Sequence, residues 1–361
     1  PGGPVASSDA PPPRGPSAAG RPGATAPRAA ASTASAVEPR STFRLFKGLS
    51  SIIERVPLEL SEPVASLVAG AIASRGGATA EQVGENLAAA VAQVPGAQAD
   101  PALMRRLVAR AYRGYGRYWV EGAKLPELER SRVMSRMQIT EGLEHLEAAK
   151  AAGRGVVVAL PHVGSWEWGG SFLNGIGMHM TAVAEALEPP EMFDWFVEKR
   201  RAMGISILPL DSRSGTAVAK VLAEGGVVGL LCDRDLQGNG IEVDFLGRRA
   251  KLPAGPATLA LRSGATLLTA AVYSGPREQH HAIISPPLST EREGKLRQDV
   301  ARVTQDIADS LGGLIRREPT QWHVFQPLFI EDEVGGQLAA EQPPAGASAS
   351  AEHGVHAEPV T

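Results

Sequence analysis

The sequence lacks the features that mark several common classes of protein. Its 361 residues include one cysteine, Cys232, which excludes a disulfide within the chain and a zinc site made of thiolates. No run of about 18 consecutive apolar residues is present, so we expect no helix that spans a bilayer. The histidines have no metal-ligand spacing with cysteines or acids, and we expect no metal site. No apolar signal core stands near the N-terminus, so we also expect no secretion signal.

Motifs for nucleotide binding and serine hydrolysis are missing too. The chain has no Walker or dinucleotide glycine loop, and Ser165 lies in G-S-W-E-W-G, which lacks the G-x-S-x-G pattern of a serine hydrolase. The formal net charge of -3 gives no general attraction to nucleic acid. Any anionic partner must therefore be bound by a local patch of charge.

Composition divides the chain into two tails and a folded middle. Gly and Pro, 40 and 28 in number, concentrate toward the ends. Residues 1–40 are Pro, Ala, Gly and Ser with few large apolar groups to offset the entropy of ordering, and 331–361 are similar, so we expect both tails to be disordered. The intervening 41–330 are long enough to bury a core.

The folded middle opens with helical patterns. Apolar residues recur at helical spacing beside basic ones over 41–56, namely Phe43, Phe46, Leu49, Ile53 and Val56 beside Arg44 and Lys47. A basic amphipathic helix of this kind can lie among lipid headgroups, and packing on its own domain is the alternative. Further helices are predicted over 63–73, 81–94 and 100–121, the last with Asp100 as N-cap and Pro101 at the first helical position.

Strands and helices are predicted along the rest of the folded middle. Strands are expected over 156–160, 180–185, 205–208, 227–232, 241–245 and 266–273. Helices are expected over 141–152, 191–203, 215–223 and 297–316, with another that ends at Ser263.

His162 is the leading candidate for chemistry. The apolar run from Val156 to Leu160 is typical of a strand buried on both faces, as in parallel sheets. His162 follows the carboxyl end of that strand, where open α/β sheets place their ligands. Glu167 comes five residues later, near the start of a predicted helix, and could fold back to orient the imidazole. The arrangement H-x-x-x-x-E predicts a general base that takes a proton from a hydroxyl, and a structural histidine is the alternative.

A second block, D-R-D-L-Q-G-N-G-I-E-V-D-F-L-G, begins at Asp233. The Asn-Gly pair at 239–240 suits the turn of a hairpin. Alternation in I-E-V-D-F places Glu242 and Asp244 on the same face of a strand. Two such carboxylates need a cation, a proton or a substrate hydroxyl, so Glu242 is a second candidate partner for His162.

These blocks resemble a known superfamily. P-H-V-G-S-W-E after an apolar strand resembles the glycerophospholipid acyltransferases, whose signature is H-x-x-x-x-D. The block F-V-E-K-R-R-A-M-G and the closing P-T-Q-W-H are similar to motifs of its lipid A acyltransferase branch, and R-Y-W-V-E to a segment of the actinobacterial phosphatidylinositol mannoside acyltransferases. The resemblance covers about 41–330. It implies an α/β fold with a mostly parallel central sheet flanked by helices, an N-terminal helical segment and an open groove for acyl chains.

The resemblance also assigns roles to residues. The mannoside branch pairs its histidine with a glutamate that matches Glu242, so we expect His162 as the base, Glu242 as its working partner, and Glu167 as a residue that shapes the site. An R-x-x-x-G block places a phosphate-binding arginine at Arg200, with a solvated helix face as the alternative. Further substrate contacts, including a seat for the phosphates of coenzyme A in the basic turn, are expected from Asp233, Arg234, Asp244, Arg248 and Arg249.

The activity that the resemblance implies is the transfer of a long acyl group from acyl-CoA to a mannose hydroxyl of phosphatidylinositol mannoside. No metal and no cofactor other than this co-substrate is expected, and no nucleic acid. The enzyme would be peripheral, at the cytoplasmic face of the cell membrane. The alternatives are an acyltransferase for lysophospholipid or a lipid A-like acceptor, a thioesterase whose base activates water, and a lipid-binding protein without turnover.

Overall fold

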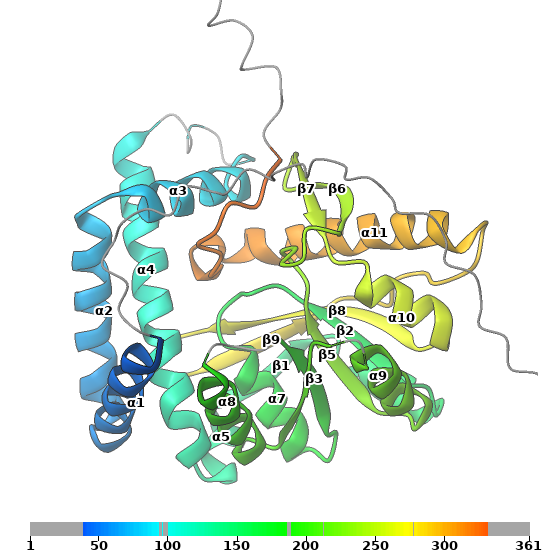
Figure 1. The fold of residues 1–361 in the computed structure, drawn as a ribbon, viewed down its shortest axis with the longest axis horizontal. Helices are drawn as coiled ribbons and strands as arrows, with labels where there is room; N and C mark the ends of the chain where they lie inside the picture. The colour runs from blue at the N-terminus through cyan, green and yellow to red at the C-terminus, as the bar shows by residue number, and fades with distance from the viewer. Residues whose placement is uncertain are drawn as a thin grey trace, which may run out of the picture. The chain divides into compact units, whose positions relative to one another are not determined.

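The computed structural model describes residues 39–93, 96, 100–185, 189–211, 213–276 and 278–330, and a seven-stranded sheet lies at the centre of this part (Figure 1). The predicted tails lie outside the described residues, apart from Pro39 and Arg40. The strand order is β1-β9-β8-β2-β5-β3-β4. The strands are β1 (Met137–Glu141), β2 (Val156–Leu160), β3 (Met180–Ala184), β4 (Ile205–Pro209), β5 (Val227–Leu231), β8 (Thr266–Ser274) and β9 (His280–Ile284).

The sheet is mostly parallel, as expected. β2 pairs in parallel with both β5 and β8, and β3 joins β5 to β4 in the same direction. β9 reverses by pairing antiparallel with β8, and β1 follows β9 in parallel. Because five neighbouring strands share one direction, their carboxyl ends meet along a single edge, which is where ligands bind in such sheets.

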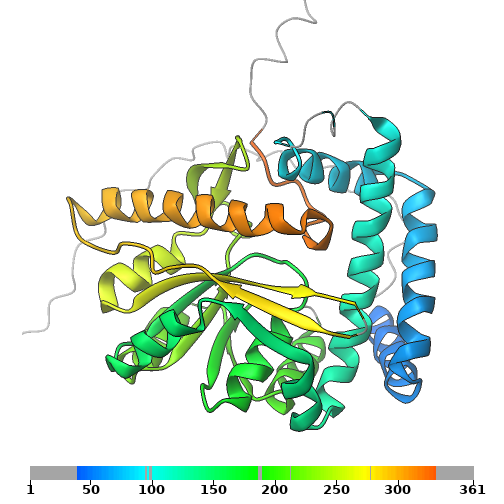
Figure 2. The ribbon, with the colours of Figure 1, turned by 180° about the vertical axis from the view of Figure 1, so that it is seen from behind.

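Helices cover both faces of the sheet. All five residues of β2 are buried, and they alternate between two hydrophobic cores, with Val157 and Ala159 in one and Val156, Val158 and Leu160 in the other. Figure 2 shows α11 crossing one face while other helices lie on the opposite face. The first core includes residues of α9 (Ser214–Ala223), α10 (Gly255–Ser263) and α11 (Leu296–Arg317), and the second includes residues of α5 (Arg130–Arg136), α6 (Leu143–Ala151) and α7 (Trp166–Gly175).

The first four helices of the described chain stand beside the sheet (Figure 1). They are α1 (Pro39–Arg55), α2 (Leu58–Ser74), α3 (Ala78–Ala90) and α4 (Pro101–Lys124). The predicted cap is confirmed, because Asp100 Oδ1 accepts hydrogen bonds from the main-chain N–H groups of Ala102 and Leu103. α4 is followed by a short helix at Leu125–Glu127, and α8 (Pro190–Ala202) lies between β3 and β4 in the chain. Within the described residues, no helix combines the length and apolarity needed to cross a bilayer.

A hairpin is present, but it follows the predicted strand 241–245 instead of ending at the start of it. β6 (Ile241–Phe245) and β7 (Arg248–Leu252) pair antiparallel and turn at Leu246 and Gly247, whose φ angles are 55° and 84°. Two positive φ angles are what a tight hairpin turn requires. The prediction of a turn at Asn239 and Gly240 is wrong, because that pair precedes β6 and its Gly240 N–H donates to Asp235. Leu246 keeps its side chain buried in the core, which offsets the cost of its backbone conformation.

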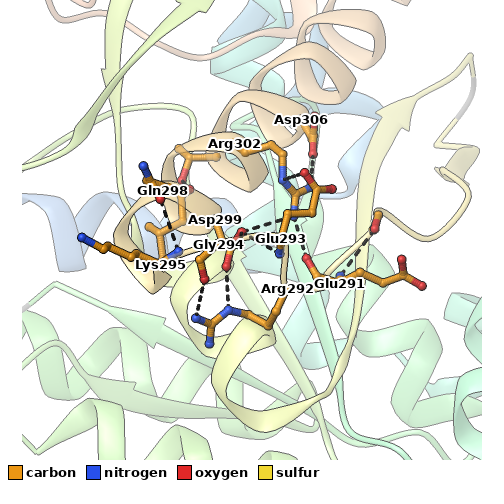
Figure 3. A network of polar contacts seen from close by, with 12 residues as sticks. Glu291, Arg292, Glu293, Gly294, Lys295, Gln298, Asp299, Arg302 and Asp306 are labelled. Carbon is orange, nitrogen blue, oxygen red and sulfur yellow. Dashed lines mark hydrogen bonds and ion pairs between the residues drawn. The ribbon is translucent and has the colours of Figure 1, made fainter.

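A buried carboxylate holds the loop before α11 in place (Figure 3). Asp299 is 2% exposed and accepts hydrogen bonds from the main-chain N–H groups of Glu293 and Gly294 and from Arg292 Nε at 2.6 Å. Arg302 pairs with Glu293 from the next turn of the helix. The hydrogen bond from Arg292, more than any other contact, holds the pKa of Asp299 below its usual range.

We expect Asp299→Asn to lower the urea midpoint of unfolding at pH 7, because the charge-assisted bond from Arg292 is lost. The pKa of Asp299 is lower in the folded state than in the unfolded state. The ionised side chain therefore stabilises the fold fully at a pH above the unfolded-state pKa, and this stabilisation is lost as the pH falls through the folded-state pKa. The difference in urea midpoint between wild type and variant should therefore become smaller below about pH 4. Exposed Asp194→Asn is the control. A gap that persists in acid would contradict the assignment.

Candidate active site

The two central strands end level with each other and bring His162 to Asp233. β2 and β5 pair with Leu160 opposite Leu231, so the residues two positions later come side by side. His162 Nδ1 lies 2.5 Å from Asp233 Oδ1, and the His162 main-chain N–H donates to Oδ2 over 2.8 Å. The Asp233 side chain is fully buried, whereas that of His162 is 21% exposed. The carboxylate thus holds one ring nitrogen and leaves Nε2 as the atom that can meet a substrate proton.

The segment that follows α11 completes this site. Trp322, which is buried, donates its indole Nε1–H to Asp233 Oδ2 over 2.7 Å. The main-chain N–H of His323 donates to the carbonyl of His162 over 2.7 Å, and Gly164 N–H donates to Gln321 O. These bonds fix both the carboxylate and the main chain that carries the imidazole.

Charge at the site is set by burial and by these bonds. Burial alone would raise the pKa of Asp233, but the neighbouring His162 and the hydrogen bonds from His162 and Trp322 hold it below its usual range. Burial, followed by the nearness of His162, lowers the pKa of His323 to about 3. Asp233 is therefore ionised and His323 neutral near pH 7. His162 thus lies beside one negative charge, and His323 adds no positive charge.

Glu167 has partners other than His162. It is buried in the first turn of α7, and its Oε1 accepts hydrogen bonds from Tyr118 Oη and Arg200 Nη2, each at 3.1 Å. Burial and then the charge of Glu167 raise the pKa of Tyr118, so the phenol stays protonated and donates. The structure contradicts the direct contact of Glu167 with the imidazole that the H-x-x-x-x-E spacing suggested, because Asp233 holds that position.

The predicted pairing of Glu242 with His162 is also contradicted. Glu242 and Asp244 do share one face of β6, as predicted, while Val243 and Phe245 turn into the core. That face is the outer one: the Glu242 side chain is 52% exposed and pairs with Arg249. The alternation that places the apolar side chains of β6 inside therefore turns this carboxylate to solvent.

The other predicted substrate contacts are divided between two places. Arg200 is mostly buried beside Glu167, and its guanidinium lies over the rings of Trp166 and Phe196 at 5.0 and 5.4 Å. Arg234 follows Asp233 and donates to Gln326. The remaining three lie exposed on the hairpin: the main chain of Asp244 bonds Gln305, Arg248 lies over Phe329, and Arg249 pairs with Glu242.

A cavity of about 370 Å³ lies next to Glu167 and Arg200. Side chains of α1, α4 and α8 line it, and most are apolar or aromatic, as with Ile53, Trp119 and Phe196. Tyr118, which donates to Glu167, stands 5.5 Å from the ring of His323. Glu167 and Tyr118 therefore lie between the cavity and the segment bonded to His162.

Residues 34–331 match the family of bacterial lipid A biosynthesis acyltransferases. The chain belongs to this family. The predicted resemblance is thereby confirmed, and so is the enzyme class: an acyltransferase of lipid biosynthesis.

Two relatives are similar to this chain over most of its length. A phosphatidylinositol mannoside acyltransferase of Mycobacterium tuberculosis is 35% identical over 256 residues, which cover 70% of this chain and 78% of the relative. One from Mycolicibacterium smegmatis is 32% identical over 285 residues, covering 78% and 89%. Among solved structures, the 1-acyl-sn-glycerophosphate acyltransferase PlsC of Thermotoga maritima matches with a TM-score of 0.30 at 15% identity, covering 57% of this chain and 82% of that one.

The sequence did not indicate the roles that two residues have in this candidate site. Asp233 was expected to contact substrate, and Trp322 was seen only as part of the closing motif. A signal for Asp233 was present, because Leu160 and Leu231 end neighbouring parallel strands and each is followed two residues later by a polar side chain. No comparable signal exists for Trp322, whose contact joins positions 89 residues apart.

We expect Asp233→Asn to lower kcat/KM for acyl transfer by roughly 10²- to 10⁴-fold, because the ring loses the acceptor that fixes its tautomer and balances its charge. Glu242→Gln is the matched control, and its activity should stay close to wild type. Steady-state kinetics with a thioester donor measures both. If the glutamate variant lost as much activity as the aspartate variant, the pairing described here would be contradicted.

Proposed function

We propose that the protein transfers a long-chain acyl group from acyl-CoA to a mannose hydroxyl of phosphatidylinositol mannoside. The observation that carries the proposal is the pair of His162 and Asp233 at the carboxyl ends of β2 and β5, with one ring nitrogen bonded and the other left for a substrate. The similarity to mycobacterial phosphatidylinositol mannoside acyltransferases supports the choice of acceptor. The mostly apolar cavity lined in part by Glu167 and Arg200 supports a lipid substrate.

In the proposed reaction, His162 Nε2 takes the proton of the acceptor hydroxyl as its oxygen attacks the thioester carbonyl. The tetrahedral intermediate collapses with cleavage of the C–S bond, which forms the ester. The imidazolium returns the proton to the leaving sulfur, so free thiol departs and the base is regenerated. Asp233 orients the ring and stabilises its charged form, and the scheme uses neither a metal nor a covalent enzyme intermediate.

Basic side chains are the proposed contacts for phosphate. Arg200, beside the cavity, would meet a phosphate at the acyl-transfer site, with Asp233 and Arg234 at the end of β5 bordering the acceptor. Arg248 and Arg249, exposed on the hairpin with Asp244, are the proposed seat for the phosphates of coenzyme A.

We place the membrane contact mainly on α2. Large apolar side chains on this helix and the end of α1 are 48 to 73% exposed: Ile52, Leu60, Val64, Leu67, Val68 and Ile72. The opposite face of α2 packs on α4, where a Cβ at Gly116 would come within 3.0 Å of Ala65 O. A helix that is apolar on both faces needs a second apolar environment besides its own domain. Exposed Lys47, Arg55 and Arg75 flank the stripe and suit an anionic, cytoplasmic bilayer surface.

We expect His162→Ala to lose roughly 10²- to 10⁴-fold in kcat with acyl-CoA and phosphatidylinositol mannoside, since the general base is removed. Exposed His179→Ala is the control, and circular dichroism checks that both variants fold. Retained activity in folded His162→Ala would exclude the proposed role. Thiol release at the full rate without any acceptor would instead indicate a thioesterase.

We expect the double variant Val64→Glu, Leu67→Glu to bind anionic vesicles at least roughly tenfold more weakly, because two apolar side chains can no longer enter the bilayer. Co-sedimentation with vesicles measures the change. Ile176→Glu, an exposed apolar residue just after α7, is the control and should bind like wild type. Equal binding by all three proteins would remove α2 from the membrane contact.

A further inference from the structure

α4 contains a glycine that the packing of the protein does not require. A Cβ at Gly116 would come within 3.0 Å of Ala65 O, and one at Gly114 would come within 3.4 Å of Thr320 O, so close neighbours account for both. A Cβ at Gly122 would meet no atom of the described part of the chain within 4 Å. Gly122 has no positive φ either, and it lies inside a long helix, where glycine is unfavourable compared with alanine.

The space in front of Gly122 is the cavity beside Glu167. Gly122, Ala123 and Trp119 are the residues of α4 that line it, and Phe196 and Met203 belong to the same lining. The small residues on α4 therefore enlarge the cavity directly.

The charged groups at the edge of this cavity form ion pairs, and only Glu167 Oε2 and Arg200 Nε among their described buried atoms lack a hydrogen bond. Lys199 pairs with Glu54 at 2.9 Å, and Arg200 pairs with Glu167 at 3.1 Å. A sugar ring inside the cavity would find mostly aromatic and aliphatic walls with few groups to hydrogen bond. A long alkyl chain matches those walls, because its burial needs no polar partner.

We propose that the cavity binds the alkyl chain of a lipid substrate and that Gly122 sets how long a chain it accepts. The inference rests on the proposed function and specifies one wall of its binding site. Because glycine has no side chain, position 122 leaves volume for the end of the alkyl chain. The cost is a lower helix stability of α4 at that position. The chain can belong to the acyl donor or to the tails of the acceptor, and the two sources are separable by experiment.

The test compares Gly122→Ala and Gly122→Leu with the same changes at Gly313. Gly313 lies in α11, is exposed, and also has no atom within 4 Å of an added Cβ, so it is a matched control for helix propensity. Both alanine variants should raise the melting temperature of the ligand-free protein by roughly 2 °C. Of these variants, only those at Gly122 should change the preference for the length of the lipid chain.

In the donor arm, acyl-CoA esters of increasing chain length are compared at a fixed acceptor. We expect Gly122→Leu to reduce kcat/KM for the longest donors by roughly tenfold or more, the loss that corresponds to about two methylenes left unburied, while short donors react as with wild type. Gly122→Ala should give a smaller shift in the same direction. In the acceptor arm, the donor is fixed and the length of the acceptor's tails is varied.

A shift in either arm supports the proposal and identifies which lipid supplies the chain. An unchanged length preference in both arms, with Gly122→Leu folded and matching Gly313→Leu, would overturn it and leave the proposed function intact. If Gly122→Leu does not fold, Gly122→Ala decides by the same criterion. Absence of transfer by the wild-type enzyme with every donor and acceptor would instead count against the proposed function.

Discussion

A fully buried carboxylate is the constraint on which the site depends. Asp233 would be costly to bury without partners, and its two oxygens instead receive the ring and main-chain N–H of His162 and the indole of Trp322. These donors come from the loop after β2 and from the segment after α11, while the carboxylate follows β5. Three distant stretches of chain must therefore come together to stabilise the buried charge of Asp233. The same contacts orient the imidazole of His162.

α4 lies between the candidate active site and the proposed membrane contact. Tyr118 on this helix donates to Glu167, whose other partner is Arg200, and the next turn lines the cavity through Gly122. Another face of α4 packs on α2, which carries the exposed apolar stripe. One helix thus adjoins the proposed acyl-transfer site, the proposed alkyl pocket and the proposed membrane contact, as we would expect of an enzyme whose substrates come from a bilayer.

Apolar runs in the sequence predicted the positions of strands reliably. Every strand predicted from such a run, β2 included, lies within one residue of its observed bounds, because burial on both faces leaves a continuous apolar segment. β1, β7 and β9 were not predicted, since Met137–Glu141, Arg248–Leu252 and His280–Ile284 carry charged or polar residues. His162 was identified, but its partner was not, because the pairing follows from strand register. Glu242 was favoured instead because of the alternating pattern of 241–245. That pattern is present in β6, but it turns the Glu242 side chain to solvent.

Proton NMR of the imidazole of His162, with ¹⁵N-labelled histidine, tests the central claim most directly. We expect neutral His162 to carry its proton on Nδ1, with a far-downfield resonance from the short bond to Asp233 that is lost in Asp233→Asn. A proton on Nε2, or a ring resonance indifferent to that substitution, would contradict it.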